Sequence, residues 1–209
     1  LGYDGDARSV VLVGSPRSPQ PLWLFDRASG RLSVLDDLSD TGQPYSYATQ
    51  ASLDGARVAY TVQSANADNT VWTWQVRLID DRSVAGIHRV LDAAAGARTA
   101  DREPRMDFVT LDYPWVVWRD IRESNRYRWD AFALNIATAE VRNLSLNPVT
   151  GERDWGGVLK VDLLGTMAVF DISMGGGSEP VVEDIVMVDL ATNVHTKLTN
   201  AAGGQTYPT

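Results

Sequence analysis

The sequence repeats a short strand–turn–strand pattern four times, and this repeat limits the possible folds more than any other feature. Each copy has a run of alternating apolar residues, a polar residue that starts a turn, and a second short run, which is typical of a β-hairpin. The copies are Leu22–Leu35, Val76–Leu91, Ala131–Ser145 and Ile185–Thr199. The turn-starting residues Asp26, Asp80, Asn135 and Asp189 are 54, 55 and 54 residues apart. A regular period of this size predicts a repeat architecture.

Further strands precede each hairpin. One precedes every copy, at Ser9–Val13, Arg57–Thr61, Pro114–Asp120 and Thr166–Asp171, and an earlier one precedes the last three copies, at Tyr45–Ser52, Arg105–Leu111 and Gly157–Leu163. Each unit therefore has strands A, B, C and D in chain order. Four antiparallel strands repeated around an axis form a β-propeller blade. We predict an all-β fold, a β-propeller of four four-stranded antiparallel blades near 1–38, 43–93, 105–146 and 157–200, in one domain over 1–209.

The two ends of the sequence resemble the two halves of one more unit. Gly203–Thr209 is similar to the start of strand A at Gly42–Ala48, whereas the first unit lacks a strand A. We expect residues 203–209 to complete the first blade and close a four-bladed ring, because closure removes exposed sheet edges. The alternative is that the chain is a fragment of a larger propeller.

Three segments resemble the repeat of TolB-like propellers. They are Ser52–Tyr60 (SLDGARVAY), Val116–Leu134 (VVWRDIRESNRYRWDAFAL) and Asp184–Thr199 (DIVMVDLATNVHTKLT). The resemblance extends over all four units and implies a propeller fold. It also implies several functions, because this repeat occurs in interaction scaffolds, in glycan-active proteins and in the propellers of prolyl-oligopeptidase-like enzymes.

Composition restricts the partners. The net charge of −8 argues against nucleic acid and against anionic membranes, both of which need a basic surface. No apolar run is long enough to span a membrane. The absence of cysteine excludes a disulfide scaffold. No signal peptide precedes Leu1, which indicates a removed leader or a piece of something larger, and we expect a periplasmic or extracellular location.

The residues do not form a recognisable catalytic or metal motif. His88 and His195 are the only histidines, and both fall in strand D, the outer edge of a blade, where we expect them to be exposed and far apart. Nucleophile-elbow, phosphate-loop and metalloprotease patterns are absent. We expect the turn-starting Asx residues to bind backbone N–H groups two residues further on. The prediction is no catalytic residue, no metal and no cofactor.

Charged and aromatic residues concentrate in the connections that share one face of a propeller, those joining B to C and D to the next A. We call this side the loop face. The candidate ligand-binding residues are Arg102, Arg105, Asp120, Arg122, Arg153, Asp154 and Trp155. Binding residues usually lie on loops held by a rigid scaffold. We therefore expect a non-catalytic binding module for a protein, peptide or glycan. The alternatives are a glycan-active or glycan-binding propeller and the propeller part of a prolyl-oligopeptidase-like serine peptidase.

Overall fold

The computed structural model describes residues 2–13, 20–83, 87–97, 105–121, 129–146, 149–150, 157–174 and 182–199. These residues form four antiparallel sheets of four strands each, in the predicted order. Sheet 1 contains β1 (Gly2–Gly5), β2 (Ser9–Val13), β3 (Leu22–Asp26) and β4 (Arg31–Asp36). Sheet 2 contains β5 (Tyr45–Asp54), β6 (Arg57–Ala65), β7 (Val71–Ile79) and β8 (Arg89–Ala97). Sheet 3 contains β9 (Met106–Asp112), β10 (Trp115–Asp120), β11 (Asp130–Asn135) and β12 (Glu140–Asn143). Sheet 4 contains β13 (Gly157–Leu164), β14 (Met167–Met174), β15 (Val182–Asp189) and β16 (Val194–Lys197).

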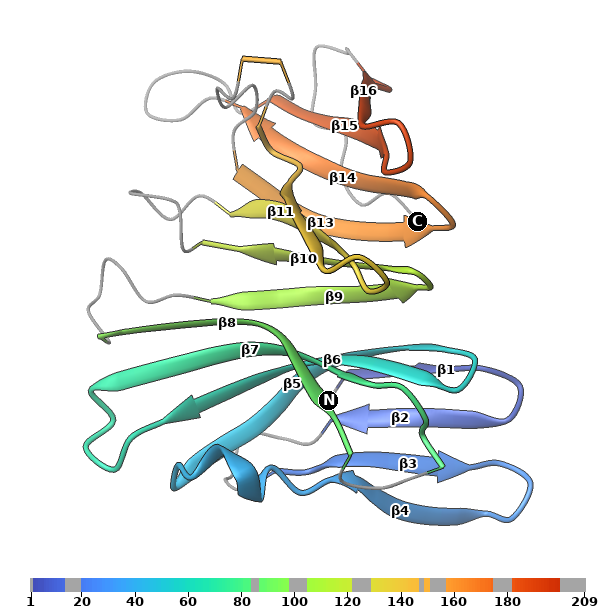
Figure 1. Ribbon diagram of the computed structural model, residues 1–209, viewed down its shortest axis with the longest axis vertical. Helices are drawn as coiled ribbons and strands as arrows, with labels where there is room; N and C mark the ends of the chain where they lie inside the picture. Colours follow the sequence, from blue (N-terminus) through green and yellow to red (C-terminus); the bar gives the residue numbers. More distant parts are fainter. Residues whose placement is uncertain are drawn as a thin grey trace.

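The sheets stack one after another along the longest axis of the molecule (Figure 1). The first strands of successive sheets contact each other, from β1 to β5, β9 and β13. Sheets 1 and 4 lie at opposite ends of the stack. One short 3-10 helix, η1 (Ser39–Thr41), connects sheet 1 to sheet 2. No helix in the described part of the chain could span a membrane. The all-β fold with four-stranded antiparallel blades is confirmed.

The expectation that the first unit lacks a strand A is wrong. Gly2–Gly5 fills this position as β1 and pairs with β2, with Gly2 opposite Val13 and Gly5 opposite Val10. The strand is short and contains two glycines, which have low strand propensity, so its sequence does not read as a strand. The predicted closing strand at 203–209 lies outside the described residues.

At two adjacent positions of strands B and C, each sheet carries a larger residue pair on one face and a smaller pair on the other. The two faces of a sheet are defined by two pairs of opposed residues on strands B and C. The back pair lies on the face that, in sheets 2, 3 and 4, contacts the preceding sheet. The back pairs are Leu12–Trp23, Tyr60–Arg77, Trp118–Phe132 and Phe170–Val186. The adjacent front pair faces the next sheet; the front pairs are Val11–Leu24, Ala59–Leu78, Val117–Ala133 and Val169–Met187.

The back pairs of sheets 2, 3 and 4 are buried in the seams between sheets, where they pack near the front pair of the sheet before. Tyr60, Trp118 and Phe170 are each fully buried. Large side chains on one face therefore meet smaller ones on the other, as close packing of two sheets requires. We call the three contacts seam 1/2, seam 2/3 and seam 3/4.

Carboxylates near the end of strand A connect each of the first three sheets to the next, and we call these contacts turn links. Asp4 accepts hydrogen bonds from the Leu53 amide (2.7 Å) and the Ser52 hydroxyl (3.1 Å). Asp54 accepts one from the Tyr113 amide (2.9 Å). Asp112 accepts one from the Gly165 amide (2.6 Å). In sheet 4 the corresponding residue is Leu164, which is 80% exposed, so the series of turn links ends there.

The predicted Asx contacts at the C–D turns hold for three of the four residues. Asn135 and Asp189 accept hydrogen bonds from the amides two residues further on, at 2.9 Å in both turns. Asp26 accepts from the Ala28 amide two residues on, and also from the amide and hydroxyl of Ser29. Asp80 forms ion pairs with Arg89 (3.0 Å) and Arg57 (3.6 Å). The turn geometry thus differs among the four units even though the residue type recurs.

Candidate functional site

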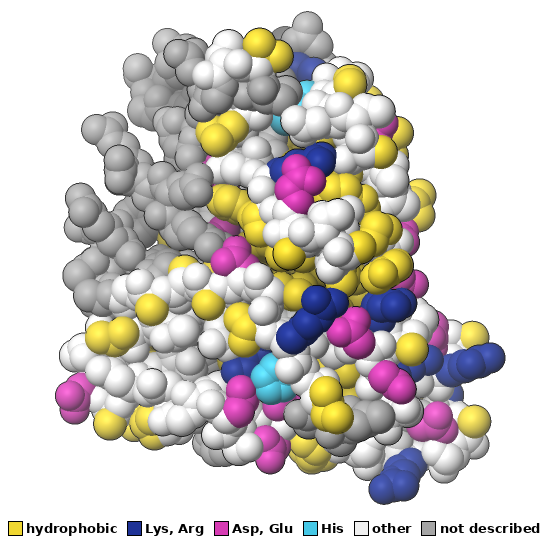
Figure 2. Space-filling view, in the orientation of Figure 1, with side chains coloured by type: hydrophobic (Ala, Val, Ile, Leu, Met, Phe, Trp, Pro, Cys, Tyr) yellow, Lys and Arg dark blue, Asp and Glu magenta, His cyan; other side chains and the backbone are white. Residues whose placement is uncertain are grey.

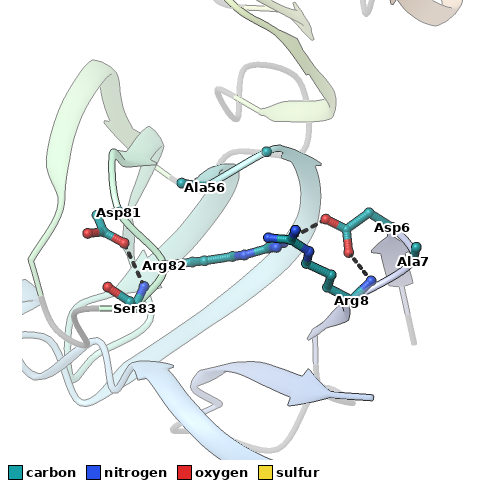
Figure 3. A pocket seen from close by; sticks show the side chains of 8 residues that line it. Asp6, Ala7, Arg8, Ala56, Asp81, Arg82 and Ser83 are labelled. Carbon is teal, nitrogen blue, oxygen red and sulfur yellow. Dashed lines mark hydrogen bonds and ion pairs between the residues drawn. The ribbon is translucent and has the colours of Figure 1, made fainter. Parts of the chain in front are cut away.

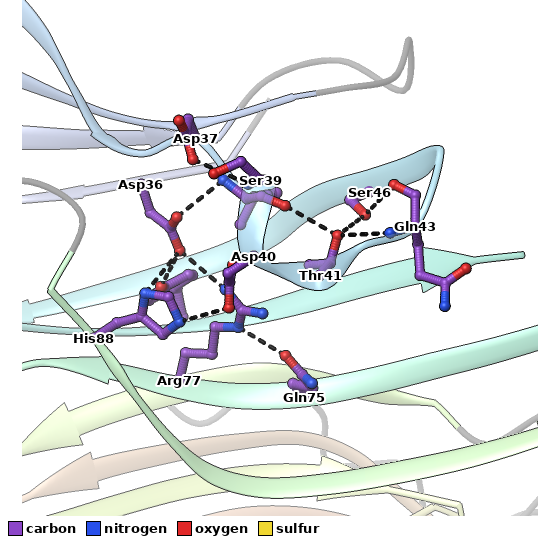
Figure 4. Close-up of polar contacts among 12 residues, drawn as sticks. Asp36, Asp37, Ser39, Asp40, Thr41, Gln43, Ser46, Gln75, Arg77 and His88 are labelled. Carbon is purple, nitrogen blue, oxygen red and sulfur yellow. Dashed lines mark hydrogen bonds and ion pairs between the residues drawn. The ribbon is translucent and has the colours of Figure 1, made fainter.

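A polar cluster lies in seam 1/2, and we call it the seam cluster: Asp36, Asp40, Tyr60, Arg77 and His88. Figure 4 shows Asp36, Asp40, Arg77 and His88 pointing toward one another. Asp36 ends β4, and Asp40 belongs to η1. Tyr60 and Arg77 are the back pair of sheet 2, on β6 and β7. His88 precedes β8. The connection from sheet 1 to sheet 2 therefore places two carboxylates against the polar back pair of sheet 2.

Arg77 is the centre of the seam cluster. Its side chain is 1% exposed, and its guanidinium donates to Asp36 at 3.2 Å and to Asp40 at 2.9 Å. Its Nε donates to Gln75 Oε1 at 2.7 Å. The Tyr60 hydroxyl donates to the same Asp36 oxygen, while the other Asp36 oxygen accepts from the Leu38 amide (2.9 Å). Because both charges are buried, this network is needed to offset their desolvation.

His88 completes the seam cluster, and its expected exposure on the rim is wrong. Its side chain is only 11% exposed, with Nε2 3.1 Å from Asp40 Oδ2 and Nδ1 3.5 Å from Asp36 Oδ2. His88 lies directly before β8, where its ring nitrogens approach Asp36 at the end of β4 and Asp40 of η1. His195 lies in β16 of sheet 4, so the two histidines are in different sheets, as expected.

The pKa shifts follow from burial and from these partners. Burial, followed by the negative charge of Asp36, raises the pKa of Tyr60 far above its ordinary value. Burial also acts to raise the pKa of Asp40, but the hydrogen bond and charge of Arg77, together with His88, lower it overall. Tyr60 therefore stays a hydrogen-bond donor, and Asp40 stays ionised. These states suit a permanent ion-pair network better than a proton-transfer site.

The seam cluster has the ligand types of a cation site. Oxygen or nitrogen atoms of Asp36, Asp40 and His88 all lie within 4.8 Å of one another. Arg77 already donates to both carboxylates, so an added cation would compete with a buried guanidinium. The arrangement is accounted for as a fixed connection between sheets 1 and 2.

A second cluster lies on sheet 3 near the loop face, and we call it the Arg119 cluster. Arg119 is the penultimate residue of β10, and its guanidinium stacks between Phe108 (4.4 Å) and Trp129 (4.0 Å). It donates to both carboxylate oxygens of Asp107 and to the Leu159 carbonyl of sheet 4. Burial raises the pKa of Asp107, against the opposing effect of Arg119.

The backbone at the Arg119 cluster is unusual. Phe108 has φ of 52°, a left-handed conformation that is rare for a bulky residue. Its amide donates to the Gln50 side chain of sheet 2. The pairing of β9 with β10 shifts register at this point, between Val117 and Arg119. The shift is a β-bulge, a feature that often re-aims side chains at the ends of sheets.

Two of the predicted ligand-binding residues lie in the described part of the chain. Arg105 is exposed directly before β9, and its carbonyl accepts from the Ile121 amide at 3.3 Å. Asp120 ends β10 and is fully buried. Arg105, directly before β9, and Asp120, the last residue of β10, therefore lie at the same end of sheet 3. Arg102, Arg122, Arg153, Asp154 and Trp155 lie outside the described residues.

A pocket lies on the side opposite the loop face, between the turns of sheets 1 and 2 (Figure 3). Its volume is about 460 Å³. Arg82 crosses it and pairs with Asp6 at 3.0 Å. Hydrogen bonds from the Ser9 and Arg8 amides, with Arg82, lower the pKa of Asp6 despite the opposing effect of burial. On the visible face in Figure 2, charged side chains of both signs gather over sheets 1 and 2, while hydrophobic ones form a band beside sheet 3.

Comparisons with known proteins agree with the fold. No family model matches the sequence, and no curated protein matches it. Among solved structures, the chain is similar to TolB from Acinetobacter baumannii, with 11% identity, TM-score 0.53, and coverage of 95% of this chain and 42% of that one. It is also similar to the β-propeller domain of the Trilobed protease from Pyrococcus furiosus, with 10% identity, TM-score 0.56, and coverage of 95% and 56%.

These similarities define the chain as a β-propeller protein, with the TolB-like resemblance confirmed at the level of structure. The identities are too low to indicate more than the fold. The chain spans about half the length of the structures it matches.

Proposed function

We propose that this chain is a non-catalytic binding module that uses its loop face to bind a protein, peptide or glycan. The observation that carries the proposal is the Arg119 cluster. Phe108 and Trp129 are only partly buried, and the guanidinium between them is held by a carboxylate and a backbone carbonyl. Aromatic and arginine side chains on a rigid support are the residues that contribute most at binding surfaces.

The position of the cluster supports the same proposal. Trp129 directly precedes β11, so it lies where the third B–C connection rejoins the sheet. The predicted residue Arg105 lies beside the start of β9, the strand that carries Asp107 and Phe108. In the sequence, the predicted Arg102, Arg122, Arg153, Asp154 and Trp155 belong to the connections that directly precede or follow β9, β10 and β13. A periplasmic or extracellular location is part of the proposal and rests on the TolB-like resemblance.

A comparison of two aromatic variants tests the proposal. Binding would be screened with a glycan array and a displayed peptide library, and any hit measured by calorimetry with the full chain. We expect Trp129→Ala to weaken binding at least tenfold. Tyr113→Ala is the matched control, because Tyr113 also stacks on an arginine, Arg57 at 3.9 Å, but lies at the opposite end of sheet 3.

The results of the two variants show whether binding depends on the loop face. Binding lost in Trp129→Ala and kept in Tyr113→Ala would support the proposal. Equal loss in both variants, or no hit in either library, would contradict it. Hydrolysis of a glycan or peptide by the chain would contradict the non-catalytic part and favour a glycan-active propeller.

A further inference from the structure

The two outer faces of the stack carry the two kinds of residue pair that meet in an internal seam, a back pair on sheet 1 and a front pair on sheet 4. Within the described residues, no sheet precedes the back pair Leu12–Trp23 of sheet 1, since Val11, Leu22 and the other alternate residues face sheet 2. In the same described part of the chain, no sheet follows the front pair Val169–Met187 of sheet 4, because Phe170 and Val186 face sheet 3. All four of these outward side chains are partly exposed.

Neighbouring apolar residues enlarge both faces. Val10 and Phe25 are opposite each other beside the Leu12–Trp23 pair, and Leu32, 50% exposed, continues the face on β4. On sheet 4, Ile185 lies two residues from Met187 on the same face, and Met167 is 38% exposed. On sheet 4 the same face also carries Asp162 opposite Val169 and Asp171 opposite Ile185, so its apolar part is the patch around Val169 and Met187. Exposed apolar patches of this kind are typical of contact surfaces.

The two faces are complementary in the same sense as every internal seam. Within the stack, the larger back pair of one sheet packs near the smaller front pair of the sheet before it, three times in succession. Leu12–Trp23 is a back pair with a large aromatic ring, and Val169–Met187 is a front pair with one small and one flexible side chain. The smaller front pair of sheet 4 is therefore complementary in size to the larger back pair of sheet 1.

We propose that sheet 4 of one chain packs on sheet 1 of a second copy of this chain, in the arrangement of the internal seams. The match to the propeller domain of the Trilobed protease covers 56% of that chain, so two copies supply the length of one such propeller. A head-to-tail contact of this kind either closes into a ring or continues as a filament. Two four-sheet stacks that close on each other give a ring with two identical contacts.

The contact between copies lacks one element of the internal seams. Leu164 occupies the position at which Asp54 and Asp112 form turn links to the next sheet. The contact therefore depends on apolar packing without a turn link, and it is weaker than an internal seam. Introducing the missing carboxylate is a way to strengthen it.

Light scattering after size-exclusion chromatography tests the assembly with the full chain, whose mass is 22.9 kDa. We expect a species of twice this mass or a larger multiple. Trp23→Glu and Met187→Glu should each give the single-chain mass, while circular dichroism shows the folded state. A wild-type chain that runs only at the single-chain mass at tens of micromolar would overturn the proposal.

A mixing experiment tests the head-to-tail direction. The Trp23→Glu chain keeps an intact sheet 4, and the Met187→Glu chain keeps an intact sheet 1. Their mixture should form a mixed dimer through one intact contact, although neither variant associates alone. If mixing restores nothing, the contact does not join sheet 4 to sheet 1, and the proposal fails.

Two further variants keep the test independent of the glutamate substitutions. The sequence contains no cysteine, so a chain with Leu12→Cys and a chain with Val169→Cys can be crosslinked only at the added thiols. A short bismaleimide should join the two chains in a mixture and not either chain with itself. In addition, Leu164→Asp should lower the dissociation constant about tenfold, the effect of a hydrogen bond to a charged group. Self-crosslinking of either chain, or a Leu164→Asp chain that associates no more tightly, would contradict the arrangement.

Discussion

Seam 1/2 and seam 2/3 use the same two register positions for opposite kinds of chemistry. In seam 2/3 the back pair is Trp118 and Phe132, two rings stacked with centroids 5.8 Å apart. In seam 1/2 the corresponding pair is Tyr60 and Arg77, bound to the carboxylate of Asp36. Both pairs are buried. The comparison shows that the blade-to-blade position accepts a large polar pair as well as a large apolar one.

The difference has an energetic consequence. A stacked aromatic pair needs no partner from the neighbouring sheet, whereas Arg77 depends on residues from the connection between sheets 1 and 2. The polar seam therefore fixes the position of η1 and Asp36 in a way that the aromatic seam does not. Substitutions in the two seams test this difference in their contributions to stability.

The substitution Arg77→Met should have the largest effect. It leaves the Asp36 carboxylate buried without its counter-ion, and removing one partner of a buried pair costs about 3–5 kcal/mol. Urea unfolding would measure the loss. Arg82→Met is the control, because the Arg82–Asp6 pair is closer to solvent and should contribute about 1 kcal/mol or less. Equal losses in the two variants would show that Arg77 has no special role.

Removing both charges should recover stability. In the double variant Asp36→Asn/Arg77→Met the asparagine oxygen can still accept from the Leu38 amide, and no charge is left buried. We expect this variant to regain more than half of the loss caused by Arg77→Met, as replacements of buried ion pairs often do. A double-mutant cycle measures the coupling. Simple additivity of the two single losses would contradict the proposed pairing.

Tyr60→Phe removes only the hydroxyl that donates to Asp36. A hydrogen bond to a charged group contributes about 1.5–3 kcal/mol, so the urea midpoint should fall by a corresponding amount. Arg77 still neutralises Asp36 in this variant, which makes the effect smaller than that of Arg77→Met. A midpoint that does not change would mean that the hydroxyl makes no net contribution.

Met106→Leu examines the apolar seam. Met106 is fully buried in the cluster of seam 2/3. Volume-conserving exchanges in a core usually cost less than about 1.5 kcal/mol. Thermal unfolding would show whether seam 2/3 tolerates repacking more readily than seam 1/2 tolerates a change in Arg77 or Tyr60.

Asp40→Asn gives the smallest effect, which is present near neutral pH and fades in acid. Its pKa is lowered in the folded state, so its contribution to stability is complete above its unfolded pKa of about 3.9 and is lost as pH falls through the lower folded value. The wild type should therefore lose more stability below about pH 4 than Asp40→Asn does. Urea midpoints at neutral and acidic pH provide the measurement, and parallel pH profiles would contradict the assignment.

The sequence was sufficient for most of the fold because hairpin spacing and alternation are local signals. The predicted strand Ser9–Val13 agrees with β2, and the predicted hairpin Leu22–Leu35 contains β3 and most of β4. The strand β1 was missed because Gly2 and Gly5 have low strand propensity, and the strand depends on its pairing with β2.

The seam cluster was missed because it joins residues far apart in the sequence. Asp36 and Arg77 meet only after two sheets have stacked, and no local pattern reports that contact. One signal was present: Arg77 interrupts an apolar run in β7, and a charge in such a run indicates a buried partner. The predicted binding residues stay predictions, with Arg105 and Asp120 placed at one end of sheet 3.

The alternation of larger and smaller faces gives the stack a direction, and this has an evolutionary consequence. A unit copied in tandem arrives with both of its faces already matched to its neighbours, because each unit carries the same asymmetry. Whole units can then be gained or lost without redesigning the contacts, whereas reversing one unit would bring like faces together. Lineages of such proteins should vary in the number of units more readily than in the internal order of a unit.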